Sequence, residues 1–222
     1  MIEALRVMLE PSGIRIRGVF HCREGEGPEL DKGGKARTVV LLGNIGGSIW
    51  EPFSHWRNTR DDGGNNPLDR WSEDVIGPVA EAIGAVAYFP SDKPWWPFQR
   101  WAKIAEGLEP SPLGLLIHPE YGLWHGYRGA LGFAEEHEFP AAPRLPSPCS
   151  KCAKKPCLEA CPAHAISEKG FDVPACRAFL AADEGQAGCV KTGCVARNAC
   201  PVGSEYRYPA AQLAFHMEAL DI

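Results

Sequence analysis

The sequence predicts an α+β fold in two parts. Over residues 1–138, short apolar runs typical of strands alternate with segments whose apolar residues recur at helical spacing, which is the pattern of a layered domain of sheet and helices. Four prolines then fall within residues 139–148 and predict a stiff linker. Eight of the nine cysteines follow, so residues 149–222 predict a small second domain built around its thiols.

The start of the leading domain is predicted to hold one helix and two strands. Residues 1–10 indicate a short helix, which a proline, a serine and a glycine end. Residues 14–20 alternate between apolar side chains and two arginines, which predicts a half-buried strand with Arg15 and Arg17 on its outer face. Residues 38–43 are a continuous apolar run, which indicates a strand buried on both faces.

Two helices and a strand are predicted next. A helix begins near Trp50, because aromatic residues recur there at helical spacing. Asn66 is the expected N-cap of a second helix, since a proline at the first helical position follows it. Pro78 is expected to kink or split that helix. Residues 85–89 then indicate a short strand.

The remaining elements complete both domains. Residues 98–106 predict a helix with its large apolar side chains turned inward. Residues 114–118 and 123–133 are strand-like segments joined by a turn. In the cysteine-rich domain, Asp172 is expected to cap a helix, and a last helix is expected to begin at Pro209 with Leu213, Ala214, Met217 and Leu220 inward.

Composition favours a cytoplasmic protein that binds neither membrane nor nucleic acid. The apolar fraction is 45% and the formal charge is −5, which does not favour nucleic acid as a partner. No apolar run approaches the roughly 20 residues of a membrane helix, and the first residues do not resemble a secretory signal. Thiols stay reduced in the cytoplasm, so clustered cysteines there indicate metal rather than disulfides. Cys22, far from the others, is expected to be a core residue.

Eight cysteines follow the spacing of ferredoxin-type iron–sulfur sites. The first run is C-x2-C-x4-C-x3-C-P and the second is C-x4-C-x5-C-P, with one further cysteine upstream of it. Closely spaced thiols followed by Cys-Pro are typical of such sites. Eight thiolates make two sets of four, which predicts two 4Fe–4S clusters held by Cys149, Cys152, Cys157, Cys161, Cys176, Cys189, Cys194 and Cys200.

The two sets are expected to exchange their last thiol. In two-cluster ferredoxins the cysteine before the proline ligates the other cluster. Carried onto this chain, one set is Cys149, Cys152, Cys157 and Cys200, and the other is Cys161, Cys176, Cys189 and Cys194. The spacing departs from the ferredoxin standard, so ligand sharing is less well founded than the count of two. Two structural zinc sites would use the same residues and remain an alternative.

The cysteine-rich segment resembles the double-cluster module of epoxyqueuosine reductases and corrinoid reductive dehalogenases. The similar stretches are CLEACPAHAI, ACRAFL and GCVKTGCVARNACP. In those enzymes the module delivers electrons to a cobalamin held by a preceding domain of nitroreductase-like fold. The resemblance therefore implies a nitroreductase-like domain at residues 1–138 and a ferredoxin-like domain at residues 149–222.

A segment of the leading domain carries a second family resemblance. LGLLIHPEYGLWHGYRGALGF at residues 113–133 resembles the HPxFGGWFAIRG segment of the cobalamin-processing proteins of the methylmalonic aciduria and homocystinuria type C family, and NPLDRW fits a helix start there. Leu123 and the triplet His125-Gly126-Tyr127 depart from that segment. The resemblance implies a cobalamin pocket lined by His118, Tyr121, Trp124, Tyr127 and Arg128, with Arg128 holding an anionic or amide group.

We therefore expect an iron–sulfur redox protein, an oxidoreductase if it carries its own active site. Two clusters would pass electrons from a redox partner protein to a cofactor or substrate in the leading domain, with a corrinoid as the first choice. The alternatives are a ferredoxin-like electron carrier or adaptor without a catalytic site, and a zinc-stabilised interaction protein. A flavin in place of the corrinoid has no phosphate-binding sequence to support it.

Overall fold

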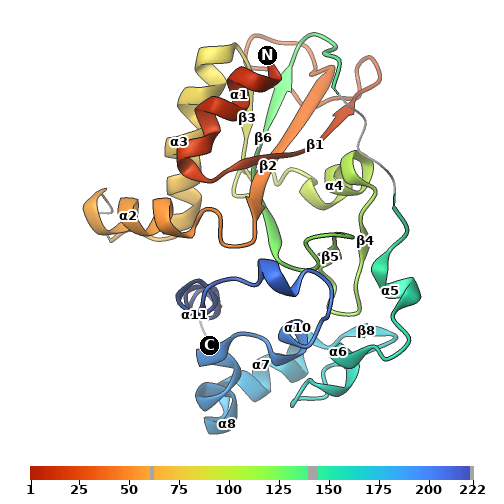
Figure 1. The fold of residues 1–222 in the computed structure, drawn as a ribbon. Coiled ribbons are helices and arrows are strands. Elements are labelled where there is room, and N and C mark those ends of the chain that lie inside the picture. Colours follow the sequence, from red (N-terminus) through yellow and green to blue (C-terminus); the bar gives the residue numbers. More distant parts are fainter. Residues whose placement is uncertain (61–62, 140–144, 221–222) are drawn as a thin grey trace. The chain divides into compact units, whose positions relative to one another are not determined.

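A computed structural model describes residues 1–60, 63–139 and 145–220 (Figure 1). The chain divides into two compact units, Met1–Gly107 with Gly126–Arg144 and Leu108–His125 with Leu145–Ile222. Residues 108–125, which the sequence analysis placed in the leading domain, are thus grouped with the cysteine-rich segment. Residues 140–144, half of the predicted linker, lie outside the described residues.

The first unit is organised around a four-stranded sheet in the order β1-β2-β6-β3. Its strands are β1 (Arg15–His21), β2 (Thr38–Ile45), β3 (Val86–Tyr88) and β6 (His125–Phe133). β1 runs antiparallel to β2, and β3 runs antiparallel to β6. Every residue of β2 except its last is buried, because the strand lies inside the sheet and helices cover both faces. The prediction from its continuous apolar run is confirmed.

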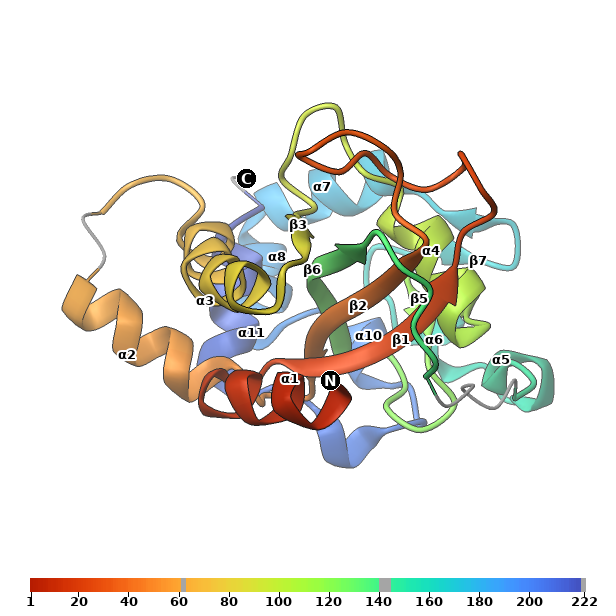
Figure 2. The ribbon, with the colours of Figure 1, turned by 90° about the horizontal axis from the view of Figure 1, so that it is seen from above.

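Helices of the first unit cover the sheet on both sides. They are α1 (Ile2–Leu9), α2 (Trp50–Arg60), α3 (Pro67–Ile83) and α4 (Phe98–Glu106). α1 and α3 lie on one face and α4 on the other (Figure 2). α4 packs so closely on β1 that a Cβ at Gly18 would lie 2.6 Å from Cγ of Glu106. The predicted outer face of β1 is therefore covered, and Arg17 is buried while Arg15 is exposed.

Two details of α3 differ from the prediction. Asn66 is the N-cap residue and Pro67 the first helical residue, as predicted, but Asn66 has a left-handed backbone (φ 53°) and its side chain makes no cap hydrogen bond. Pro78 lies inside one continuous helix, so the helix is not split there, and the kink stays a prediction. Proline removes one backbone donor from a helix, but α3 buries Trp71, Ile76 and Val79 on one face. This packing holds the helix together across the proline, because tertiary burial outweighs local propensity.

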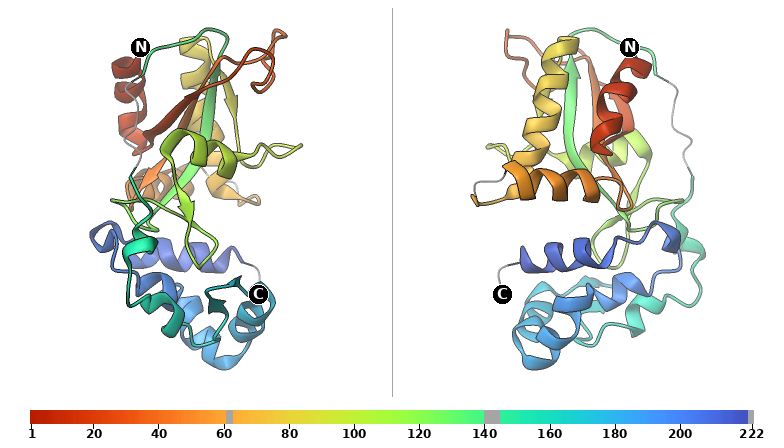
Figure 3. Two further views of the ribbon diagram at one scale, coloured as in Figure 1. Left: turned by 90° about the vertical axis from the view of Figure 1, so that its right-hand side faces the viewer. Right: turned by 60° about the vertical axis from the view of Figure 1, so that its left-hand side comes forward.

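The second unit consists of two small hairpins and a series of short helices (Figure 3). One hairpin pairs β4 (Glu109–Pro110) with β5 (Leu116–Ile117), and the other pairs β7 (Ile166–Ser167) with β8 (Gly170–Phe171). The helices are α5 (Pro148–Lys151), α6 (Pro156–Glu159), α7 (Val173–Ala181), α8 (Asp183–Ala187), α9 (Cys189–Thr192), α10 (Val195–Asn198) and α11 (Ala210–Glu218). The expected strand at residues 114–118 is thus reduced to two residues.

Two predicted helix starts in this unit are confirmed, and one residue that was predicted to be buried is exposed. The Asp172 carboxylate accepts a hydrogen bond from the backbone N–H of Ala175 at 2.9 Å and caps α7. α11 begins directly after Pro209 and buries Leu213. Leu220, expected to point inward, is 40% exposed because the helix ends before it.

The core of the second unit explains why residues 108–125 belong to it. Its buried cluster is formed by Leu113, Ile117, Leu123, Cys161, Ala165, Ile166 and Ala196. The first three come from the segment 108–125, so this segment supplies much of the apolar volume that the cysteine-rich segment lacks. The backbones also meet closely, since a Cβ at Gly122 would lie 1.9 Å from the carbonyl oxygen of Val202. In the described part of the chain, no helix has the length and apolar character needed to cross a membrane.

Candidate functional site

The structure collects the first four cysteine side chains from three segments. Cys149 lies in α5, Cys152 follows it, Cys157 lies in α6, and Cys200 follows α10. All four line one cavity, whose empty space is ≈ 430 Å³ with the solvent at its mouth included. Burial raises the pKa of the Cys149 thiol, and the neighbouring thiols of Cys200, Cys157 and Cys152 raise it further. These four sulfurs are therefore close enough to interact electrostatically.

The other four cysteine side chains gather at a second cavity. Cys161 follows α6, Cys176 lies in α7, Cys189 begins α9, and Cys194 precedes α10. The cavity that they line has an empty space of ≈ 790 Å³, again including solvent at its mouth. Burial raises the pKa of Cys176, and the thiols of Cys194, Cys161 and Cys189 raise it further. The fold thus makes the same two sets that the spacing predicts, although ligation itself stays a prediction.

Apolar side chains and backbone groups surround the thiols at both cavities. Their remaining lining is largely apolar, including Leu113, Ile117 and Leu123 at the first and Ile166 and Leu180 at the second. Backbone groups also reach the sulfurs. Burial raises the pKa values of Cys194 and Cys200, and hydrogen bonds from the backbones of Arg197 and Val202, respectively, oppose that rise. Such hydrogen bonds to sulfur are among the features that set cluster potentials.

All the cysteines of both sets are free thiols in the structure. All nine cysteines lie in the described residues, and none is in a disulfide. Among the described side chains, no group of three or more His, Cys, Asp or Glu is placed to hold a metal ion. Ligation of iron–sulfur clusters or of zinc by these thiols therefore stays a prediction.

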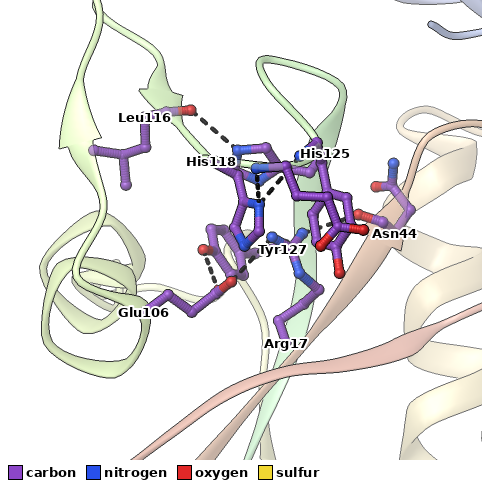
Figure 4. A network of polar contacts seen from close by, with 9 residues as sticks. Arg17, Asn44, Glu106, Leu116, His118, His125 and Tyr127 are labelled. Atoms are coloured by element: carbon purple, nitrogen blue, oxygen red, sulfur yellow. Dashed lines mark hydrogen bonds and ion pairs between the residues drawn. The ribbon is translucent and has the colours of Figure 1, made fainter. Parts of the chain in front are cut away.

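His118 and Tyr121 lie together in the second unit. Their rings stack with centroids 4.1 Å apart and planes at 10°. Nδ1 of His118 accepts hydrogen bonds from the backbone N–H groups of Glu120 and Tyr121 at 3.0 and 3.1 Å (Figure 4). An accepting Nδ1 carries no proton, so Nε2 of the neutral ring carries it. His118 is therefore arranged as a hydrogen-bond donor at Nε2.

His125 is held by a different contact. Its Nε2 lies 3.1 Å from the carbonyl oxygen of Leu116, and because a carbonyl only accepts, Nε2 carries the proton. Its ring lies edge-on to that of His118, with centroids 6.1 Å apart. Of the residues expected to line a pocket, His118 and Tyr121 are thus brought together, with His125 beside them.

Trp124 has no exposed surface and packs in the second unit. The guanidinium of Arg197 lies 4.4 Å from the centroid of its ring, and Tyr208 meets it edge-on at 5.5 Å. Arg197 also donates a hydrogen bond to the carbonyl oxygen of Leu123. Because Arg197 lies in α10, between two of the cysteines, Trp124 anchors the segment 108–125 to the cysteine-rich segment.

Tyr127 and Arg128 lie in the first unit and make contacts with different helices. The Tyr127 hydroxyl donates to the carboxylate of Glu106 in α4 at 2.6 Å, while Arg128 forms an ion pair with Asp69 in α3 at 3.8 Å. Consecutive residues of a strand point to opposite faces, and these helices cover opposite faces of the sheet. Tyr127 and Arg128 therefore point to opposite faces of the sheet, and their place in a cobalamin pocket stays a prediction.

A buried charge network surrounds Tyr127. Arg17 donates to the Glu106 carboxylate at 3.1 Å and to the carbonyl oxygen of Asn44 at 3.0 Å (Figure 4). The side chains of Arg17 and Glu106 are 1% and 5% exposed. Burial and the Glu106 carboxylate both raise the pKa of Tyr127, so the hydroxyl remains a hydrogen-bond donor. The network fixes α4 on the sheet.

Sequence reasoning missed Glu106 and Arg197. Glu106 follows Ala102 by one helical turn on the inward face of α4. An acidic residue among the apolar residues of that face indicates that a cation is buried beside it. Arg197 carried no such signal, because its contacts with Leu123, Trp124 and Tyr208 join segments distant in sequence. Cys22, expected in the core, is half-buried and lines a surface groove of the first unit.

Comparison with known proteins gives one informative likeness. No protein-family model and no curated protein matches the chain. Among solved structures, the chain is similar to a B12-trafficking protein CblC of C. elegans, described as a homologue of human MMACHC. The TM-score is 0.53 at 14% sequence identity, over 97% of this chain and 91% of that chain. The chain has the fold of that trafficking protein.

The predicted cobalamin-processing-type fold is therefore confirmed as a fold. The mixed α/β architecture agrees with the expected class. The likeness covers the cysteine-rich segment as well, and it does not show a separate ferredoxin-like domain. At this level of identity the similarity concerns architecture alone, and the ligands of the chain have to be argued from its own residues.

Proposed function

We propose that this chain is an iron–sulfur redox protein that passes electrons through two 4Fe–4S clusters to an acceptor in its leading domain. The observation that carries the proposal is the gathering of eight thiols into two sets of four at two cavities. The ligands would be Cys149, Cys152, Cys157 and Cys200 for one cluster, and Cys161, Cys176, Cys189 and Cys194 for the other. When bound, such clusters supply one-electron transfer over a wide range of potentials.

The chain's own residues would prepare both sites for this chemistry. Short helices and turns bring each thiol to its cavity, and apolar side chains make up much of the lining around the sulfurs. Cys200 would cross to the set formed by the first motif, and Cys161 to the set formed by the second. This exchange would tie the two sites into one folded unit, because neither motif completes its own set.

We propose a corrinoid as the acceptor. The fold likeness to a protein described as B12-trafficking supports this choice, and so does the similarity of residues 113–133 to the cobalamin-processing family. His118, whose ring stacks on Tyr121, would contribute a hydrogen-bond donor through Nε2 of its imidazole.

A carrier without its own active site is the second candidate. Three of the expected pocket residues are engaged in structural contacts, which favours this alternative. Trp124 has no exposed surface, Tyr127 donates to Glu106, and Arg128 pairs with Asp69. In this case the leading domain would hold no cofactor, and the protein would relay electrons between partners.

Anaerobic purification followed by elemental analysis tests the proposal. We expect about eight irons and about eight acid-labile sulfides per chain, with no zinc. Two zinc ions and no sulfide would refute the iron–sulfur assignment. Addition of cobalamin to the same preparation then separates the two candidates. A shift of the cobalamin spectrum to the base-off form supports the corrinoid acceptor, and an unchanged spectrum at protein well above micromolar supports the carrier.

A further inference from the structure

The charges of the second unit are unevenly distributed around the two thiol sets. Residues 149–171 contain four lysines and two glutamates, whereas residues 172–188 contain one arginine and three acidic residues. α5 and α6 lie at one end of the unit and α8 at another (Figures 1 and 3). The end that carries Cys149, Cys152 and Cys157 is therefore basic, although the whole chain has a formal charge of −5.

Two lysines of this basic end are accessible to a partner protein. Lys151 and Lys154 are exposed and lie between the thiols of the first set in sequence. Lys155 is paired with Glu168 at 2.6 Å, so its charge is partly compensated. Glu159, the other glutamate of this stretch, is exposed on α6. Lys169 is exposed beside Glu168 in the β7–β8 hairpin. The side chains of residues 149–171 thus carry a net charge of +2 on the protein surface, with the negative charge of the four thiolates lying behind them.

The first thiol set is also the more accessible of the two. Its four cysteines are all partly exposed, whereas Cys161 and Cys189 of the second set are each 7% exposed. Electrons pass efficiently only when the donor's redox centre approaches closely. The first set therefore combines the exposure that a donor needs with a surface charge that would attract an acidic one.

We infer that the face around Lys151 and Lys154 is the docking surface for a small acidic electron-carrier protein, which delivers electrons to the first thiol set. The inference rests on the proposed iron–sulfur function and deepens it by assigning the partner and the point of entry. The reduced carrier would give up one electron and become oxidised, and the cluster that Cys149, Cys152, Cys157 and Cys200 would hold would take up that electron. No covalent bond forms or breaks in this step.

A charge-reversal pair tests the docking surface. The variant is Lys151→Glu with Lys154→Glu in the anaerobically prepared full-length protein. The matched control is Lys32→Glu with Lys103→Glu, two exposed lysines of the first unit that give the same change in net charge. The probe is a reduced acidic 2Fe–2S ferredoxin, and the readout is the rate at which the chain's visible absorbance bleaches in a stopped-flow instrument.

We expect the variant to be reduced roughly tenfold more slowly than the control at low ionic strength. The difference should disappear near ~1 M salt, where the Debye length is about 3 Å. Equal rates for variant and control would overturn the docking surface, provided that excess dithionite still reduces both proteins fully. Loss of iron and sulfide, or failure of dithionite to reduce the wild type, would instead remove the proposed function and this inference with it.

Discussion

The exchange of Cys161 and Cys200 between the two motifs can be tested by two pairs of substitutions. Cys149→Ser with Cys200→Ser removes two thiols that line one cavity, although they are distant in sequence. Cys157→Ser with Cys161→Ser removes neighbours in sequence that line different cavities. If the structure gives the correct sets, the first pair leaves one set of four intact and the second pair leaves none.

The expected iron content follows from these sets. Wild type should hold about eight irons, and the first pair should hold about four with the spectrum of one intact 4Fe–4S cluster. The second pair should hold less iron than the first, because each cluster has lost a ligand. Iron and sulfide analysis with electron paramagnetic resonance of the reduced proteins measures this, and circular dichroism checks that both variants fold.

A sequential assignment predicts the opposite order. If Cys149, Cys152, Cys157 and Cys161 formed one set, the neighbouring pair Cys157 and Cys161 would be the one whose loss spares a cluster. An intact cluster in that variant, with less iron in the other, would show that the proposed grouping is wrong.

Three further substitutions test the supports of the fold. Gly122→Ala should melt at a lower temperature than Gly114→Ala. Both glycines have positive φ, but only at Gly122 would the added Cβ meet backbone, 1.9 Å from the carbonyl oxygen of Val202. Equal melting temperatures would contradict this. Asp172→Ala should cost about 1 kcal/mol in the free energy of unfolding by losing the cap of α7, and Asn at this position should restore most of it. Arg17→Met should cost about 3–5 kcal/mol in chemical denaturation, because it leaves the Glu106 carboxylate buried without its cation; a loss below about 1 kcal/mol would mean that the pair contributes little.

Local patterns were sufficient where a residue's surroundings follow from its neighbours along the chain. The apolar run at residues 38–43 identified the most buried strand, and the spacing of aromatic residues identified α4 with its observed bounds. Alternation along β6 was also enough to separate Tyr127 from Arg128, since neighbouring strand residues face opposite ways. The expectation that both line one cobalamin pocket rests on the family resemblance and stays a prediction.

Contacts between distant segments account for what the sequence left open. Nothing near Arg17 in sequence indicates that α4 covers it, because Glu106 is 89 residues away. Trp124 was expected to line a pocket, yet Arg197 and Tyr208 enclose it. In each case the burial of a side chain depends on which element packs above it, and this depends on the whole fold.

The sequence by itself determined that eight thiols are present in two runs, because cysteine spacing is a local property of the chain. Only the tertiary structure decided that residues 108–125 complete the core of the cysteine-rich unit. The physical reason is that residues 145–220 contribute mostly small side chains to the buried cluster of this core, namely Cys161, Ala165 and Ala196, with Ile166 as the one large residue. Leu113, Ile117 and Leu123 supply the other large side chains from a segment whose place in the fold no local pattern records.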